Sequence, residues 1–191
     1  MPSPPFNAAK AVTFDLSRGQ IVDASAGPRV LVPAAALFAL CAASSPDAAA
    51  AFAGAVGESI GAAVAKRFES AGTSAASAGV DEVADHLGGE LAVAGFGNLA
   101  IERWGRALVL VVDHGPANDG DQVFELLLAA AVKRATGFDA RCVRLARDGQ
   151  SARFLMANAS AAEKVGQWLS GGTPWAEALA RLHPSRVQGS A

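Results

Sequence analysis

The chain has little of what catalytic and metal-binding sites are usually built from. Its 191 residues include two cysteines, three histidines and no tyrosine, and only 18% of them are charged. Cys41 and Cys142 are too few for a disulfide scaffold or a structural zinc site. The three histidines, His86, His114 and His183, stand in separate segments without the close spacing of metal ligands. The composition therefore predicts neither a disulfide-stabilised fold nor a metal centre.

An excess of charge of one sign is also missing. The chain carries 16 Lys and Arg residues against 18 Asp and Glu residues, a net charge of -2. Nucleic-acid binding depends on a basic surface that contacts phosphates, so the composition does not favour it. Hydrophobic residues make up 51% of the chain, which excludes intrinsic disorder. We therefore expect a folded domain with a real core and without a nucleic-acid partner.

The longest weakly charged segment, residues 30–57, contains a single charged residue, Asp47. Pro33 and the sequence Ser44-Ser45-Pro46 interrupt it, so no apolar run reaches the ~20 residues that a membrane span needs. The segment predicts two buried helices separated by a turn, and no membrane partner. The first residues lack a basic stretch followed by an apolar one, so we expect a cytoplasmic protein.

Local patterns divide the chain into three parts. Two β-prone runs, residues 11–16 and 20–23, flank the turn Ser17-Arg18-Gly19 and predict a hairpin. A third run, residues 29–32, ends at Pro33. We expect residues 1–33 to form an N-terminal hairpin segment, residues 34–183 to form one domain, and residues 184–191 to be a disordered tail.

Helical periodicity is clearest after Pro46. Apolar side chains recur there every four residues and predict one buried stripe: Phe52, Val56, Ile60, Val64 and Phe68. Glycines at positions 54, 57 and 61 lie on neighbouring faces of the same helix. They favour close approach of another helix, with room for a ligand as the alternative. Residues 34–43 are apolar all round, which is typical of a buried helix.

Two strong hairpin patterns follow. Residues 98–104 and 107–112 flank Gly105-Arg106, and residues 140–147 and 151–157 flank Asp148-Gly149. Further helices are expected from a cap at Asp81, over residues 122–136, and over two segments between Asn158 and residue 182. This order predicts an α+β fold, in which an antiparallel sheet of two hairpins has helices packed on one side and follows the N-terminal hairpin.

The strand over residues 107–112 is apolar on both faces and is expected to be central. Its second face could be covered by the N-terminal hairpin and C-terminal helices, or by a partner subunit. Replacing Leu110 by Asp should therefore be severe. Replacement of Arg147 or Gln150, both near the second hairpin tip, is expected to change stability by no more than about 0.5 kcal/mol.

No catalytic pattern is present. Nucleophile elbows, phosphate loops and dinucleotide fingerprints are missing, and Gly95-Phe96-Gly97 precedes a strand where a phosphate loop would precede a helix. Asp81, Asp85 and His86 cluster at a helix start, which favours a solvated first turn over a metal site. Cys142 stands in the middle of a strand, where a buried thiol is ordinary. We expect no catalytic residue, no metal and no cofactor.

A pocket, if present, should lie between the helices and the sheet. The candidate ligand-binding residues are Phe52, Val56, Ile60, Trp104, Leu110 and His114. His114 follows the central strand, and such a position suits either a functional loop or an ordinary strand end. A closed apolar cavity would favour a ligand, and a filled interior would favour a structural role.

Several short segments resemble one known family. They are Gly57-Glu58-Ser59-Ile60-Gly61, residues 87–97 leading into Leu99-Ala100-Ile101, residues 109–117, and the hairpin over residues 143–154. Over residues 50–157 the chain resembles the 4-vinyl reductase domain family, which itself resembles the TRAPP-subunit and haem-nitric-oxide-binding folds. Arg144 and Ala152 stand where family members often have cysteines, so the resemblance does not extend to a thiol-based site.

The resemblance implies a function in binding. It suggests a non-enzymatic bacterial regulatory or sensor-like domain that binds a small apolar molecule, a partner protein, or both. Residues 14–33 resemble an N-terminal hairpin that helps such sensors to dimerise, and we expect a homodimer. The alternatives are a structural or adaptor protein with a filled pocket and, third, a reductase-related accessory enzyme with a bound cofactor.

Overall fold

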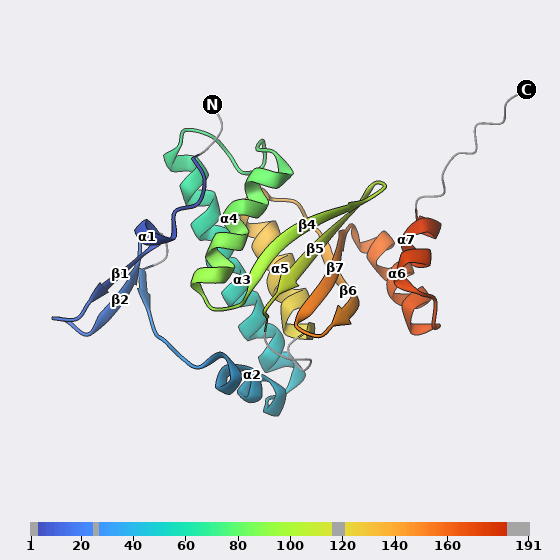
Figure 1. The fold of residues 1–191 in the computed structure, drawn as a ribbon, viewed down its shortest axis with the longest axis horizontal. Helices are drawn as coiled ribbons and strands as arrows, with labels where there is room; N and C mark the ends of the chain where they lie inside the picture. Colours follow the sequence, from blue (N-terminus) through green and yellow to red (C-terminus); the bar gives the residue numbers. More distant parts are fainter. Residues whose placement is uncertain (1–3, 25–26, 116–120, 183–191) are drawn as a thin grey trace, which may run out of the picture.

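The computed structural model describes residues 4–24, 27–115 and 121–182. It has an α+β fold with a small N-terminal sheet and a four-stranded sheet packed against helices (Figure 1). The predicted fold class is confirmed. The tail over residues 184–191 and part of the loop after His114 lie outside the described residues.

The main sheet consists of the two predicted hairpins. β4 (Asn98–Trp104) pairs with β5 (Ala107–Asp113), and β6 (Arg141–Asp148) pairs with β7 (Ser151–Ala157). All neighbours are antiparallel and the order is β4-β5-β7-β6, so β5 and β7 are central. The glycines in the two turns have φ angles of 61° at Gly105 and 55° at Gly149, which other residues adopt at a cost.

One face of the sheet is covered by α3 (Pro46–Ser70), α4 (Val80–Val93) and α5 (Asp121–Thr136). α3 and α5 pack along each other, and α4 lies against β4 (Figure 1). Leu110 and Val112 of β5 and Phe154 of β7 point into this larger core. Ile60, Val64 and Phe68 of the predicted apolar stripe also belong to this core, and each is at most 1% exposed.

The opposite face has a smaller core of its own. Val109 and Val111 of β5 and Leu155 of β7 pack there against α6 (Ala159–Ser170) and α7 (Trp175–Leu182). The sequence predicted helices on one side of the sheet and did not decide what covers the second face. The C-terminal helices supply that cover, and no partner subunit is needed for it.

The N-terminal unit is more than a hairpin. After α1 (Ala8–Ala11), the strands β1 (Val12–Asp15), β2 (Gln20–Asp23) and β3 (Gly27–Arg29) form an antiparallel sheet in the order β1-β2-β3. α1 and the pairing of β3 were not predicted. The third run was expected over residues 29–32, but β3 ends at Arg29 and residues 30–32 are exposed. Within the described residues, this unit contributes no side chain to either core.

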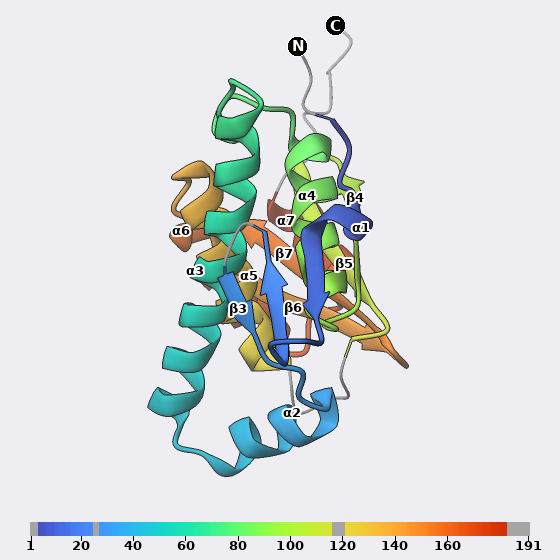
Figure 2. The same cartoon turned by 90° about the vertical axis from the view of Figure 1, so that its left-hand side faces the viewer.

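An extended linker joins β3 to α2 (Ala34–Ala43), which lies at one end of the molecule in both views (Figures 1 and 2). Ser45 caps the following helix, since its Oγ accepts a hydrogen bond from the Ala48 N–H at 3.2 Å. The expected cap at Asp81 was wrong by two residues. Gly79 is the N-cap of α4, and the Asp81 carboxylate instead pairs with Arg103 of β4.

α3 is long and apolar enough to cross a membrane by length and composition alone, but core helices of globular proteins have the same properties. In this fold two of its glycines, Gly57 and Gly61, contact α5. A methyl group at Gly57 would overlap the Leu127 carbonyl oxygen, and one at Gly61 would overlap that of Ala131. Packing, the favoured interpretation of these glycines, is confirmed, whereas Gly54 has open space around it.

The central position of β5 predicts the effect of a buried charge. Leu110 is 3% exposed in the larger core, so Leu110→Asp should lower the free energy of unfolding by more than ~3 kcal/mol. Thermal or denaturant melts measure this loss. A tolerated substitution would contradict the central position of the strand.

The glycine contacts predict opposite effects along one helix. Gly57→Ala and Gly61→Ala should each destabilise the fold by roughly 1–3 kcal/mol, because the α5 backbone cannot yield easily. Gly54→Ala is the matched control and should be neutral or stabilising by up to about 1 kcal/mol, since alanine favours helix. Denaturant melts of the three variants compare them directly, and equal effects at all three positions would refute the close-packing explanation.

Candidate functional site

The six predicted ligand-binding residues do not all come together. Ile60 and Leu110 are buried in the larger core, and Phe52 and Val56 pack against its margin. Trp104 lies on the opposite face of the sheet and is 42% exposed. Its ring contacts Trp175 edge-on, with ring centres 4.7 Å apart.

His114 lies outside the core. It is exposed at the end of β5, with a φ angle of 57°, and its Nδ1 lies 3.1 Å from the Gln150 side-chain oxygen. This contact joins the ends of the two hairpins. His114 therefore makes a polar contact at the surface and is not part of the apolar core that contains Ile60 and Leu110.

Phenylalanine rings fill much of the space between helices and sheet. Phe38 of α2 stacks on Phe124 of α5, with centres 5.9 Å apart and planes 5° apart. Phe96 packs edge-on against both rings, and Phe124 also contacts Phe154 of β7. Such ring pairs add stability beyond the area that they bury. This arrangement resembles a core more than a binding chamber.

A small cleft opens beside α2. It holds about 160 Å³ and is lined by Cys41, Ala42, Ser44, Pro46, Ala49, Ala50, Gln122, Val123 and Leu126. These residues come from α2, from the start of α3 and from the start of α5. The cleft is smaller than the ~300 Å³ at which ligand pockets usually begin.

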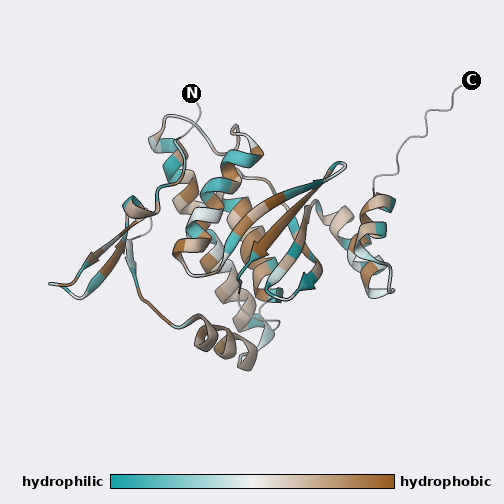
Figure 3. Cartoon of the chain, in the orientation of Figure 1, coloured by the Kyte–Doolittle hydropathy of each residue, from teal (hydrophilic) through white to brown (hydrophobic). Residues whose placement is uncertain are grey.

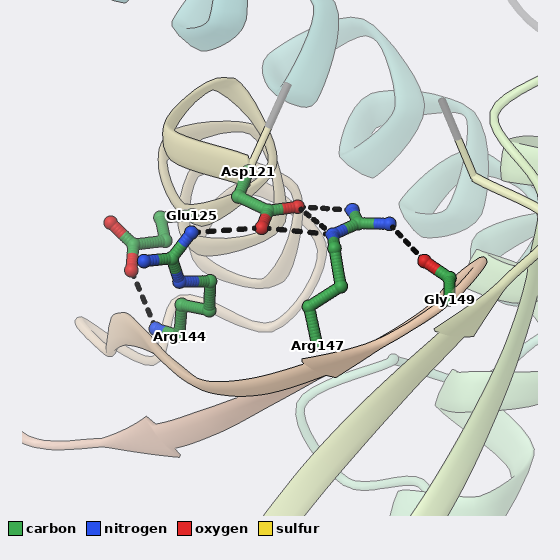
Figure 4. A network of polar contacts seen from close by, with 5 residues as sticks. All are labelled: Asp121, Glu125, Arg144, Arg147 and Gly149. Atoms are coloured by element: carbon green, nitrogen blue, oxygen red, sulfur yellow. Dashed lines mark hydrogen bonds and ion pairs between the residues drawn. The ribbon is translucent and has the colours of Figure 1, made fainter. Parts of the chain in front are cut away.

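A larger open groove of about 610 Å³ lies between the start of α5, β6 and the end of α6. Its residues are Asp121, Gln122, Glu125, Val143, Arg144, Gly166, Leu169 and Ser170. Figure 4 shows the charged network at its edge. Arg147 makes a two-pronged contact with the buried Asp121, and Arg144 donates to the same carboxylate at 3.0 Å.

Electrostatics hold this network together. Burial works to raise the pKa of Asp121, but hydrogen bonds from Arg147 and Arg144 bring that pKa below its usual value. Burial raises the pKa of Glu125, which accepts a hydrogen bond from the Arg144 backbone N–H. That bond covers an outward-facing N–H of the edge strand β6. The network therefore ties α5 to the sheet edge, and its charges neutralise one another.

Two polar residues that sequence analysis had placed in ordinary exposed positions make buried contacts. His86, expected in a solvated turn, is 3% exposed and contacts the ring of Phe68. Burial lowers the pKa of His86. Arg147, expected to tolerate replacement, pairs with buried Asp121. The expected tolerance is corrected because removing this arginine leaves a buried carboxylate with less compensation.

Glu90 is another buried charge, missed by sequence analysis. It is 1% exposed on α4 and pairs with Arg67 of α3. A signal was available: Glu90 stands between Leu87 and Leu91 on the apolar side of its helix. Within the described residues there is no group of three or more His, Cys, Asp or Glu side chains able to hold a metal ion.

The most unusual surface is apolar. Val30, Leu31 and Val32 are 84%, 75% and 51% exposed, and Leu40 of α2 is 67% exposed. We call these four residues the linker surface. No charged residue lies between Arg29 and Asp47, and Figure 3 shows the linker in hydrophobic colours as it leaves the small sheet.

The two arginines of the network should differ in importance. Arg147 is 11% exposed in its side chain and Arg144 is 52% exposed. We expect Arg147→Ala to lower the free energy of unfolding by roughly 3 kcal/mol, because Asp121 stays buried with its main partner removed. Arg144→Ala, the matched control, should cost about 1 kcal/mol or less. Urea melts measure both, and equal losses would contradict the central role of Arg147.

Comparisons of the chain with protein-family models, with curated proteins and with solved structures found no match. The resemblance to the 4-vinyl reductase domain family therefore stays a prediction. The case for a function depends on the residues of this chain alone.

Proposed function

We propose that the protein is a non-enzymatic regulatory or adaptor domain that acts by binding protein, and that its first partner is a second copy of itself. The observation that carries the proposal is the linker surface. Three consecutive aliphatic side chains and the outward leucine of α2 face solvent, and no charged residue lies between Arg29 and Asp47 in the sequence. Exposed apolar patches of this kind mark interaction sites.

The same end of the molecule offers both a projection and a recess. α2 carries the exposed Leu40, while its neighbours Cys41 and Ala42 border the 160 Å³ cleft. Leu126, 37% exposed, continues the apolar lining on α5. A two-fold dimer uses one patch twice and requires it to be self-complementary. A projection next to a recess satisfies that requirement, which favours a second copy as the partner.

Strand preference points the same way. Val30-Leu31-Val32 is β-prone, and it follows β3 directly without continuing as a strand in this fold. A second copy of the same tripeptide could pair with it in antiparallel orientation. The near-neutral charge of the chain opposes such pairing only weakly.

The small-molecule alternative has less support. The interior carries the phenylalanine cluster, the apolar cleft is small, and the larger groove is lined by charged side chains. The binding of protein accounts for the linker surface, which a buried ligand would leave unexplained.

Light scattering after size exclusion tests the proposal. At micromolar concentration the wild type should have the mass of a dimer, and Leu31→Asp combined with Leu40→Asp should have the mass of a monomer. Both residues are mostly exposed, so the fold should survive the substitutions.

Phe138→Asp is the matched control. Phe138 is 56% exposed but lies after α5, outside the linker surface. The control should remain dimeric. A monomeric wild type, or a double variant as dimeric as the control, would remove the basis of the proposal.

A further inference from the structure

The chain before α2 is fastened to the body by an aromatic anchor. We call residues 4–24 and 27–29 the arm. Phe6 of the arm donates its backbone N–H to Asp85 Oδ2 of α4 at 3.0 Å. The Arg67 guanidinium lies 4.8 Å from the centre of the Phe6 ring, and the His86 ring meets Phe6 edge-on at 6.3 Å. A cation over an aromatic face is attractive.

The surface that receives Phe6 is shaped for a ring. A methyl group at Gly89 would overlap the ring atoms of Phe6, so only glycine leaves room there. Buried Glu90 pairs with Arg67 and thereby fixes the guanidinium under the ring. We call Arg67, Asp85, His86 and Gly89 the slot.

The strands at the other end of the arm are joined by an ion pair within the arm itself. Asp23 of β2 is 2% exposed and accepts a hydrogen bond from Arg29 of β3 at 3.1 Å. Asp23 and Arg29 both act electrostatically on Glu90, which places this pair beside the slot. The arm is thus held on the body by the ring and the backbone N–H of Phe6, and the Asp23–Arg29 pair joins β2 to β3 within it.

Among the described residues of the arm only Ala11 and Asp23 are buried. Among the described residues, no side chain of the arm belongs to either hydrophobic core. The arm itself has strands of three or four residues, too short to be stable without a surface to dock on. The arm therefore needs a slot to dock on. Because the arm is not part of either core, a second copy of the chain can supply that slot as well as the arm's own chain can.

The linker between arm and body is suited to exchange. Residues 30–32 are extended, exposed and β-prone, and Pro33 follows them. If two copies exchange arms, both slots keep the same contacts that one copy makes with itself. The two linkers are then brought together and can cover the aliphatic side chains that a single copy leaves in water.

We propose that two copies of this chain exchange their arms, so that Phe6 of each copy occupies the slot of the other and the linkers pair across the two-fold axis. This inference rests on the dimer proposed above and specifies how its two copies are joined. The partner is recognised by an aromatic ring over Arg67 and by a backbone N–H at Asp85.

Disulfide trapping tests the exchange in the full chain. The methyl position at Gly89 coincides with the ring of Phe6, so Phe6→Cys and Gly89→Cys place two thiols within reach of a disulfide. A tagged Phe6→Cys chain is refolded with an untagged Gly89→Cys chain and oxidised. We expect a covalent heterodimer. The native Cys41 and Cys142 are buried, and each single variant alone reports their background.

The chain with both substitutions distinguishes the alternatives. Exchange predicts a covalent dimer, whereas closure within one chain gives a covalent monomer and overturns the exchange. Phe14→Cys with Gly89→Cys is the control, because Phe14 is 59% exposed on β1 and is not in the slot. Absence of any disulfide between positions 6 and 89 would overturn the slot itself.

A second variant needs no crosslink. Gly89→Leu fills the slot, and under exchange it should weaken dimerisation at least tenfold while the body stays folded by circular dichroism. An unchanged dimer would refute the exchange but leave the proposed dimer intact. A wild type that is monomeric in light scattering would instead refute the proposed function, so the two failures are distinguishable.

Discussion

The close approach of α3 and α5 is the constraint on which the rest of the structure depends. Gly57 and Gly61 let the α5 backbone lie directly on α3, and larger residues there would push the helices apart. With α5 in place, Asp121 at its start reaches the arginines of β6. With α3 in place, Arg67 near its end reaches Glu90 of α4. One backbone contact thus places the buried carboxylates Asp121 and Glu90 within reach of their arginine partners.

Buried carboxylates connect the parts of the molecule, and they respond to pH in opposite directions. Arginine hydrogen bonds lower the pKa of Asp121 despite its burial, so its contribution is present above its ordinary pKa and is lost as the pH falls through the lowered value. Burial raises the pKa of Glu90, and its folded form therefore loses stability as the pH rises from the ordinary value through the raised one. The contribution of Asp121 is thus lost in acid, while Glu90 is most costly when ionised.

Local sequence signals predicted the periodic parts of the fold. Both main hairpins have turn glycines and alternating strands, and the stripe from Phe52 to Phe68 has a four-residue spacing, so each is visible within a short window. The Asp121 and Glu90 pairs join residues 23 or more positions apart and have no period. The pairing of β3 was missed because Pro28 and Gly27 are poor strand formers, and the arm slot because a lone glycine at position 89 has no distinctive pattern. Of the predicted pocket, burial of Ile60 and Leu110 followed from periodicity. The position of Trp104 could not be predicted, because the sequence did not show which helices cover each face of the sheet.

α2 links the filled interior to the exposed surface. Its inner side supplies Phe38, which stacks on Phe124 and occupies space between helices and sheet. Because the helix is apolar all round, the side that carries Leu40 must then face outward. A helix of this composition gains most when both sides are covered, and one chain covers only one of them. Phe38, which fills the interior, therefore also turns an apolar side of α2 toward solvent, which explains why a packed core and an exposed apolar helix side occur in the same protein.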